Sequence, residues 1–178
     1  MAESRVHRLH RALGIPADYA KTHPLPAHRE ARRLVGAGRA PDDGKRVRLI
    51  PRAAKAWGRM RDTAAADGII LLPLSGFRSI NRQATIIRRK LRAGLTLADI
   101  LRFVAAPGHS EHHSGRAIDI GSPEHVTLDA DFARTAAYRW LRRHAGKFGF
   151  VLSYPKNGAL GIGYEPWHWC WHAPTQGR

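Results

Sequence analysis

The sequence predicts an α+β fold, on three observations. Several stretches place apolar residues at helical spacing, several short runs are apolar or alternate as strands do, and no regular strand–helix–strand repeat connects them. At 178 residues the chain is long enough for one domain with a full hydrophobic core. Its one cysteine, Cys170, excludes an internal disulfide, so packing and a bound metal remain as sources of stability.

Apolar spacing and terminal residues predict four helices in the body of the chain, over residues 51–68, 79–94, 97–104 and 129–149. The first starts with Pro51, which suits a first helical turn, and ends in Gly68. Ser79 is the candidate N-cap of the second helix, and Gly94 its stop.

Four short segments are predicted as strands, over residues 69–76, 115–121, 150–154 and 167–172. Pro73 favours an edge position or a bend for the first, because proline cannot donate to a sheet ladder. In the second, Ala117 and Asp119 alternate with Ile118 and Ile120, which is the two-residue period of a strand.

Residues 1–45 are basic and rich in proline and glycine, and we expect them to form a partly helical extension of the core. Helical pieces are predicted over residues 5–13 and 28–35. The beginning of the chain lacks the apolar core of a secretory signal, and no run approaches the roughly 18 apolar residues of a membrane span. We therefore expect a soluble chain with no readable export signal.

The balance of 30 Lys and Arg against 14 Asp and Glu gives a formal net charge of +16 and a pI near 11.4. Such a field favours polyanions. Nucleic acid, anionic cell-wall polymers, acidic peptides and lipid headgroups would all be attracted, and charge alone does not choose among them.

Three of the eleven histidines lie within residues 107–115, immediately before the predicted strand that carries Asp119. Imidazole and carboxylate groups are suitable zinc ligands. Because His112 and Asp119 are seven residues apart, they would point to opposite faces of one straight strand. We therefore expect His112 to approach from the preceding loop, with Ser114 and Gly115 forming the turn between them.

The C-terminal segment YEPWHWCWH supplies the second half of the candidate site, since Glu165 precedes His168 by three residues. After Pro166, alternation places His168, Cys170 and His172 on one face of a strand and three tryptophans on the other. A metal ligand at His168 would explain the polar face. The tryptophans are interpreted as core packing, and Cys170 as a small buried residue rather than a nucleophile.

Three protein ligands leave one zinc position open for water, as in hydrolytic rather than structural sites. Zinc lowers the pKa of such a water to around 7, and a nearby carboxylate takes its proton. Glu165 is the candidate base. Arg78, at the end of the first predicted strand, is the candidate that stabilises the developing oxyanion.

The elements SGFRSxxxQ, SxHxxGxAxD, KFGF, YP and YEPWHW follow one another over about residues 46–172. In order and spacing this set resembles the VanY-type D-alanyl-D-alanine carboxypeptidases, zinc peptidases related to lysostaphin-like and hedgehog-like domains. The resemblance implies that residues 46–178 form a zinc peptidase domain built on a small antiparallel sheet flanked by helices.

Position by position, the resemblance implies one Zn²⁺ ion bound by His112, Asp119 and His168, with Glu165 as base and Arg78 at the transition state. The residues implied to hold the peptide and its terminal carboxylate are Gln83, Ser110 and Tyr154. Such enzymes trim D-amino acids from peptidoglycan stem peptides. We therefore expect release of a terminal D-alanine, by a D,D- or L,D-carboxypeptidase, in the periplasm or cell wall.

The chain departs from the family pattern at Ser153, where arginine often precedes the YP pair, and at His113, where glutamine is common. These departures affect the expected substrate more than the chemistry. One alternative is a peptidoglycan endopeptidase of the phage-lysis type, which fits the high charge and the lack of a readable signal. Another is a basic nucleic-acid- or wall-binding module with a structural zinc, although structural sites normally have four ligands and are rich in cysteine.

Overall fold

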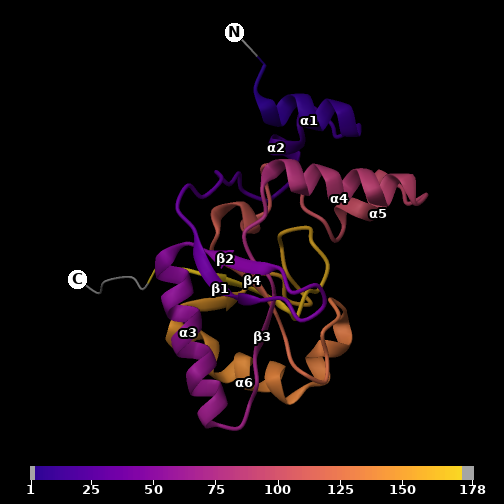
Figure 1. Ribbon diagram of the computed structural model, residues 1–178. Helices are drawn as coiled ribbons and strands as arrows, with labels where there is room; N and C mark the ends of the chain where they lie inside the picture. Colours follow the sequence, from indigo (N-terminus) through magenta and orange to yellow (C-terminus); the bar gives the residue numbers. More distant parts are fainter. Residues whose placement is uncertain (1–2, 174–178) are drawn as a thin grey trace.

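The structure is a computed structural model that describes residues 3–173, and a four-stranded antiparallel sheet lies at its centre (Figure 1). The strands of this sheet, in spatial order, are β3 (Leu72–Ser75), β4 (Ala117–Gly121), β6 (His168–Trp171) and β5 (Phe150–Leu152). A second sheet pairs β1 (Val35–Arg39) with β2 (Arg46–Leu49). The predicted α+β class with a small antiparallel sheet is confirmed, and β3, which contains Pro73, occupies the expected edge.

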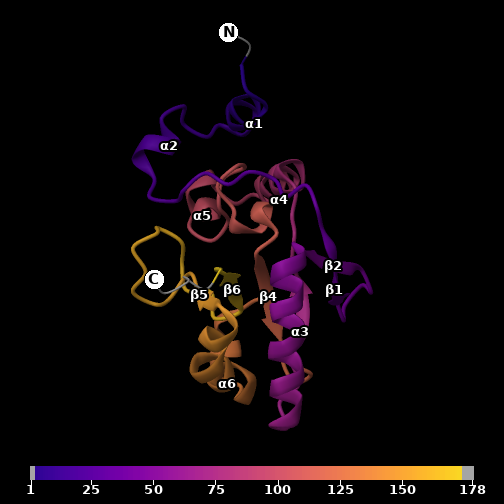
Figure 2. The same ribbon diagram turned by 90° about the vertical axis from the view of Figure 1, so that its left-hand side faces the viewer.

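Helices cover the sheet from two ends of the molecule. The α-helices are α1 (Arg5–Leu13), α2 (Tyr19–Thr22), α3 (Pro51–Ala66), α4 (Ile80–Arg92), α5 (Leu97–Leu101) and α6 (Ala136–His144), and the 3-10 helices are η1 (Glu111–Ser114), η2 (Ala130–Arg134) and η3 (Ala145–Phe148). Figures 1 and 2 place α1, α4 and α5 together beyond one end of the sheet, with α3 and α6 toward the other. Within residues 3–173, no helix is both long and apolar enough to cross a bilayer.

The main core lies between α3, α6 and the central sheet. Trp57 and Met60 of α3 are buried on one stripe of the helix and belong to the same cluster as Phe132 and Phe150. The Trp57 ring also donates from Nε1 to the carbonyl of Ala37 in β1 at 2.8 Å, which ties the small sheet to the helix. Apolar burial and one satisfied indole donor therefore fix α3 against both sheets.

A second apolar cluster joins α1 to α4 and α5. Leu13, Ile87 and Ile100 are buried in it, one from each helix. Helix α4 begins as expected, since the Ser79 side chain accepts a hydrogen bond from the amide of Arg82 at 3.1 Å. This cluster and the Ser79 cap fix α4 against α1 and α5.

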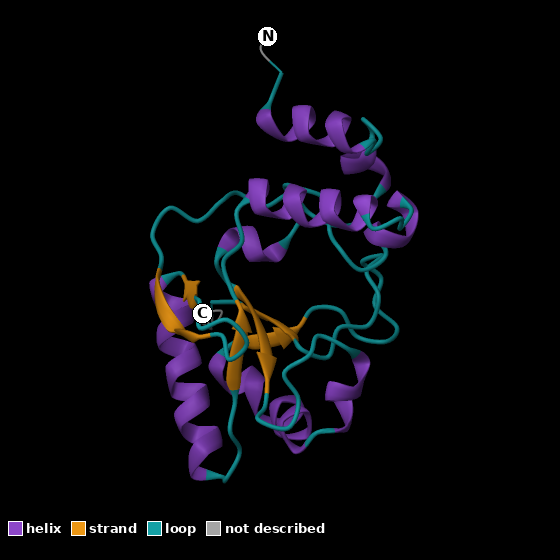
Figure 3. Cartoon of the chain, turned by 45° about the vertical axis from the view of Figure 1, so that its right-hand side comes forward, coloured by secondary structure: helices purple, strands orange, loops and turns teal. Residues whose placement is uncertain are grey.

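Residues 23–34, here called the N-terminal strap, form no helix or strand and belong to the loop segments drawn in teal in Figure 3. Their backbone bonds to the loop that precedes β4. The amide of His28 donates to Gly108 at 2.7 Å and that of Ala31 to His113 at 2.8 Å. The prediction of a helix over residues 28–35 is therefore wrong, because these backbone donors bond to a distant loop instead of to their own turn.

One predicted helix is divided in the structure, and one hairpin was not predicted. The predicted helix over 129–149 is divided into η2, α6 and η3, because extended backbone at Thr135 interrupts it and the Thr135 side chain caps α6. The β1–β2 hairpin was not predicted. Its strands lie on either side of the expected boundary at residue 45, and the division into an extension and a peptidase domain stays a prediction.

Candidate active site

Two neighbouring strands bring the first pair of candidate ligands together. Asp119 on β4 and His168 on β6 are direct register partners in the antiparallel ladder, so their side chains leave the sheet side by side. Asp119 Oδ1 lies 3.2 Å from His168 Nδ1. Sheet register alone thus unites residues that are 49 positions apart.

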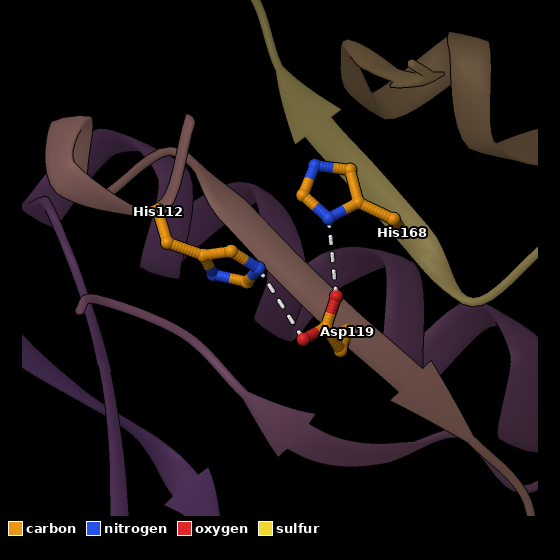
Figure 4. Close-up of side chains that lie close together, drawn as sticks. All are labelled: His112, Asp119 and His168. Atoms are coloured by element: carbon orange, nitrogen blue, oxygen red, sulfur yellow. Dashed lines mark hydrogen bonds and ion pairs between the residues drawn. The ribbon is translucent and has the colours of Figure 1, made fainter. Parts of the chain in front are cut away.

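The third candidate ligand, His112, comes from η1 in the loop before β4, as the odd spacing predicts. Its Nε2 lies 3.3 Å from Asp119 Oδ2. Gly115 ends η1 with a left-handed φ of +66°, which favours glycine and turns the chain into the strand. Figure 4 shows the two imidazoles on either side of the carboxylate, and their ligand atoms all lie within 4.8 Å of one another.

Each imidazole is held from behind through its other nitrogen. His112 Nδ1 lies 2.6 Å from the carbonyl oxygen of Gly76, and His168 Nε2 lies 2.9 Å from Glu111 Oε2. The nitrogens left facing Asp119 are therefore His112 Nε2 and His168 Nδ1. Anchoring of the outer nitrogen is the usual arrangement for metal-bound histidine, because it fixes the ring and its tautomer.

Glu111 is a site residue that the sequence reasoning missed. Its Oε2 also accepts a hydrogen bond from the Ser153 hydroxyl at 2.6 Å. Burial would raise the pKa of Glu111, but the bonds from His168 and Ser153 outweigh burial and lower the pKa to about 2. Its position next to His112 was the one available signal, since its contact with His168 spans 57 residues.

Glu165 lies at the edge of the same group, with Oε2 3.8 Å from His168 Nδ1. It is only 8% exposed. Burial raises the pKa of Glu165 to about 7, with Asp119 adding to the rise and His168 opposing it. A carboxyl group with a pKa near neutrality can both accept and release a proton there.

Arg78 follows β3, and its side chain reaches the ligand carboxylate of Asp119. One guanidinium nitrogen lies 3.7 Å from Asp119 Oδ2, and the other donates to Gln83 Oε1 at 3.0 Å. Gln83 is buried and donates in turn to the carbonyl of Ala105 at 2.7 Å. The Arg78 side chain is thus held by Gln83 while its charge faces the ligand carboxylate.

A cleft of about 510 Å³ opens over these groups, and all eight predicted site residues line it. Ser110 and Tyr154, predicted to hold substrate, are both buried at its walls. The Tyr154 ring lies 4.8 Å from that of His168, and burial raises the pKa of its hydroxyl, which stays protonated as a donor. The structure therefore brings together every side chain chosen from the sequence.

Cys170 is a residue of β6, but it does not line this cleft. It lines a separate basic pocket, and burial, together with nearby Glu111, raises the pKa of the thiol. A protonated thiol is a poor nucleophile, so its interpretation as a small buried residue is consistent with the structure.

The donor set fits a zinc ion. It offers two imidazole nitrogens and one carboxylate oxygen, all buried, with both outer nitrogens anchored. Burial opposes protonation of His168, but the bonds to Asp119 and Glu111 raise its pKa to about 10. Because a coordinating histidine must be neutral, metal binding at this position would release a proton.

A family model described as VanY, D-alanyl-D-alanine carboxypeptidase, matches residues 46–174. The chain belongs to this family. The matched range contains all eight predicted site residues that line the cleft, from Arg78 to His168.

Three known proteins illustrate the VanY-family relationship. YodJ of Bacillus subtilis strain 168 is 39% identical over 120 residues, which are 65% of this chain and 43% of YodJ. The solved structure of the LD-carboxypeptidase LdcB matches with a TM-score of 0.73 and 33% identity, over 82% of this chain and 71% of LdcB. The zinc complex of a mutant of VanY, a D,D-pentapeptidase, matches with a TM-score of 0.62 and 28% identity, over 83% and 82% of the two chains. This chain thus spans less than half of the length of YodJ.

Proposed function

We propose that this protein is a zinc-dependent peptidase that releases a terminal D-alanine from peptidoglycan stem peptides. The observation that carries the proposal is the convergence of His112 Nε2, His168 Nδ1 and the Asp119 carboxylate within 4.8 Å, at the floor of a cleft that also contains Glu165. Membership of the VanY family supports the substrate class. Because peptidoglycan lies in the cell envelope, the proposal also implies that the protein acts there.

In this proposal His112, Asp119 and His168 hold the zinc ion, which when bound acts as a Lewis acid and activates water at neutral pH. Glu165 takes the proton of the attacking water and passes it to the departing amine, a role suited to its pKa of about 7. Glu111 acts through His168 as a positioning residue, because it fixes the ring from its outer nitrogen.

Arg78 is proposed to stabilise the negative charge that develops on the carbonyl oxygen. Its guanidinium is within 3.7 Å of Asp119 and is oriented by Gln83, so little reorganisation is needed during reaction. Ser110 and Tyr154 are proposed to donate to the peptide and its terminal carboxylate, since both line the same cleft.

The decisive experiment uses purified protein with defined stem tri-, tetra- and pentapeptides, before and after removal of metal with a chelator. We expect release of free alanine from the pentapeptide, the tetrapeptide or both, loss of this activity with the chelator, and recovery on adding zinc. Product masses identify the bond and separate the D,D from the L,D reaction. Absence of any metal-dependent alanine release would refute the proposal, and cleavage within cross-linked peptides alone would favour the endopeptidase alternative.

A further inference from the structure

One wall of the cleft is a row of cations on α4. Arg82, Arg89 and Lys90 all line the cleft, with Ile86 between them. Their spacing of seven and eight residues places them on the same face of the helix, two turns apart. Residues 68–98 contain no aspartate or glutamate, so α4 and its flanks offer these cations no local counter-charge.

These side chains also have no partner elsewhere in the described residues 3–173. Neither a hydrogen bond nor an ion pair involves the charged ends of Arg82, Arg89 or Lys90 there. The carboxylates that line the cleft are engaged in other contacts. Asp119 and Glu165 belong to the metal site, and Asp129 bonds to Thr127 at 2.6 Å and to His125 at 3.0 Å. Arg82 is close enough to Asp43 to help lower the pKa of that carboxyl, so the uncompensated positive charge of the α4 wall lies at Arg89 and Lys90.

The direction of α4 determines where along a bound peptide this charge lies. The helix begins beside the floor, where Gln83 holds Arg78 against Asp119. From Gln83, which holds Arg78, to Arg89 and Lys90 the helix rises by about 9 to 10 Å, a length that an extended peptide covers in about three residues. Arg89 and Lys90 thus line the cleft about three extended peptide residues away from Arg78 and Asp119.

We propose that this wall makes the enzyme selective for stem peptides that carry a free carboxylate two or three residues before the cleaved bond. The inference rests on the proposed function and adds to it the class of substrate. Two cations without protein partners attract such a carboxylate over a neutral amide at the same position, because only the charged form gains their field. Arg82, nearer the floor, extends the same field toward the reacting end.

The test compares two peptides that differ only in the group at that position. Both have the sequence L-Ala-γ-D-Glu-L-Lys-D-Ala-D-Ala, or L-Ala-γ-D-Glu-L-Lys-D-Ala if the protein releases alanine from the tetrapeptide, with the α-carboxyl of the D-Glu residue either free or amidated. We expect the zinc-loaded wild-type protein to prefer the free carboxylate by about tenfold in kcat/KM, the effect of two partly exposed ion pairs. The double substitution Arg89→Gln with Lys90→Gln should reduce this preference to about twofold or less, chiefly by lowering kcat/KM for the free-carboxylate peptide.

The matched control is Arg88→Gln with Arg92→Gln, which also removes two positive charges from the last turns of α4, at residues that do not line the cleft. The control should keep the tenfold preference. Equal rates for both peptides with wild-type protein would overturn the inference and leave the proposed function standing. An equal loss of preference in both double variants would also overturn it, because the field of the whole basic protein would then be responsible. If wild-type protein cleaves neither peptide nor the corresponding tetrapeptides, the proposed function itself fails.

Discussion

The floor of the cleft and its α4 wall are both lined by charged and polar groups, but these groups are satisfied in opposite ways. On the floor, every ring nitrogen of His112 and His168 has an oxygen partner within 3.3 Å, and the side chains are buried. On the wall, the charged groups of Arg89 and Lys90 have no hydrogen-bond or ion-pair partner within residues 3–173. Arg89 is exposed and Lys90 is half-buried. Rigid, mutually bonded groups suit a metal and its chemistry, whereas unpaired cations are available to a substrate. The difference suggests that the floor determines the reaction and the wall determines the choice of peptide.

The largest effect should come from removing a floor ligand. His168→Ala deletes one of the three metal donors, so we expect zinc content to fall close to zero and kcat/KM to fall by roughly a thousandfold or more. Metal analysis of the purified variant and alanine release measure the two effects. The exposed His7→Ala is the control and should behave as wild type. An active, zinc-loaded His168→Ala protein would contradict the metal site.

Glu165→Gln should separate metal binding from catalysis. The amide preserves the size of the side chain and leaves the three ligands intact, but it cannot accept a proton. We expect full zinc occupancy and a loss of about 10²- to 10⁴-fold in kcat. Turnover close to wild type, with zinc bound, would exclude Glu165 as the base.

Glu111→Gln should reduce the zinc affinity of the site without removing a metal ligand. The substitution neutralises the carboxylate that anchors His168 Nε2, and such outer partners typically contribute 10- to 100-fold in metal affinity. Competition with a chelator measures the zinc affinity, and excess zinc should restore most of the activity. Glu124→Gln, at an exposed position, serves as the control. Unchanged zinc affinity in the Glu111 variant would show that Glu111 does not position the ring.

The smallest effect should come from raising the salt concentration, which screens the charges of the α4 wall. Raising the ionic strength from 0.1 M to 1 M shortens the screening length from about 10 Å to about 3 Å. We expect the preference for the free-carboxylate peptide to fall by about two- to threefold, while zinc content stays constant because the floor is buried. Kinetics with both peptides at the two salt concentrations test this, and a preference independent of salt would count against an electrostatic wall.

Local signals were sufficient for much of this molecule. Proline and serine marked the starts of α3 and α4, and the two-residue period located β4 and β6. The odd spacing between His112 and Asp119 correctly required a loop approach, as η1 shows. Motif order supplied the rest of the candidate set, and all of it lines one cleft.

The expectations that failed depend on contacts between distant segments. Residues 28–35 have a helical pattern, but bonds to Gly108 and His113 hold the strap in another conformation. The hairpin partner strand β1 has the sequence VGAGR, whose glycines disfavour a strand assignment, yet pairing with β2 and the Trp57 bond fix it. Glu111 was overlooked because its contact with His168 joins η1 to β6 across 57 residues, which sequence spacing does not reveal.

The strap also affects how the protein can be divided. The VanY family match starts at residue 46. The amides of His28 and Ala31, which donate to the loop that carries His112, lie before this boundary. A fragment trimmed to the family boundary would leave the carbonyls of Gly108 and His113 to water and would uncover the buried ring of His109, which lies 3.0 Å from the carbonyl of Leu25. Domain swaps and truncations of this chain should therefore retain residues 23–45, so that the loop bearing His112 keeps its support.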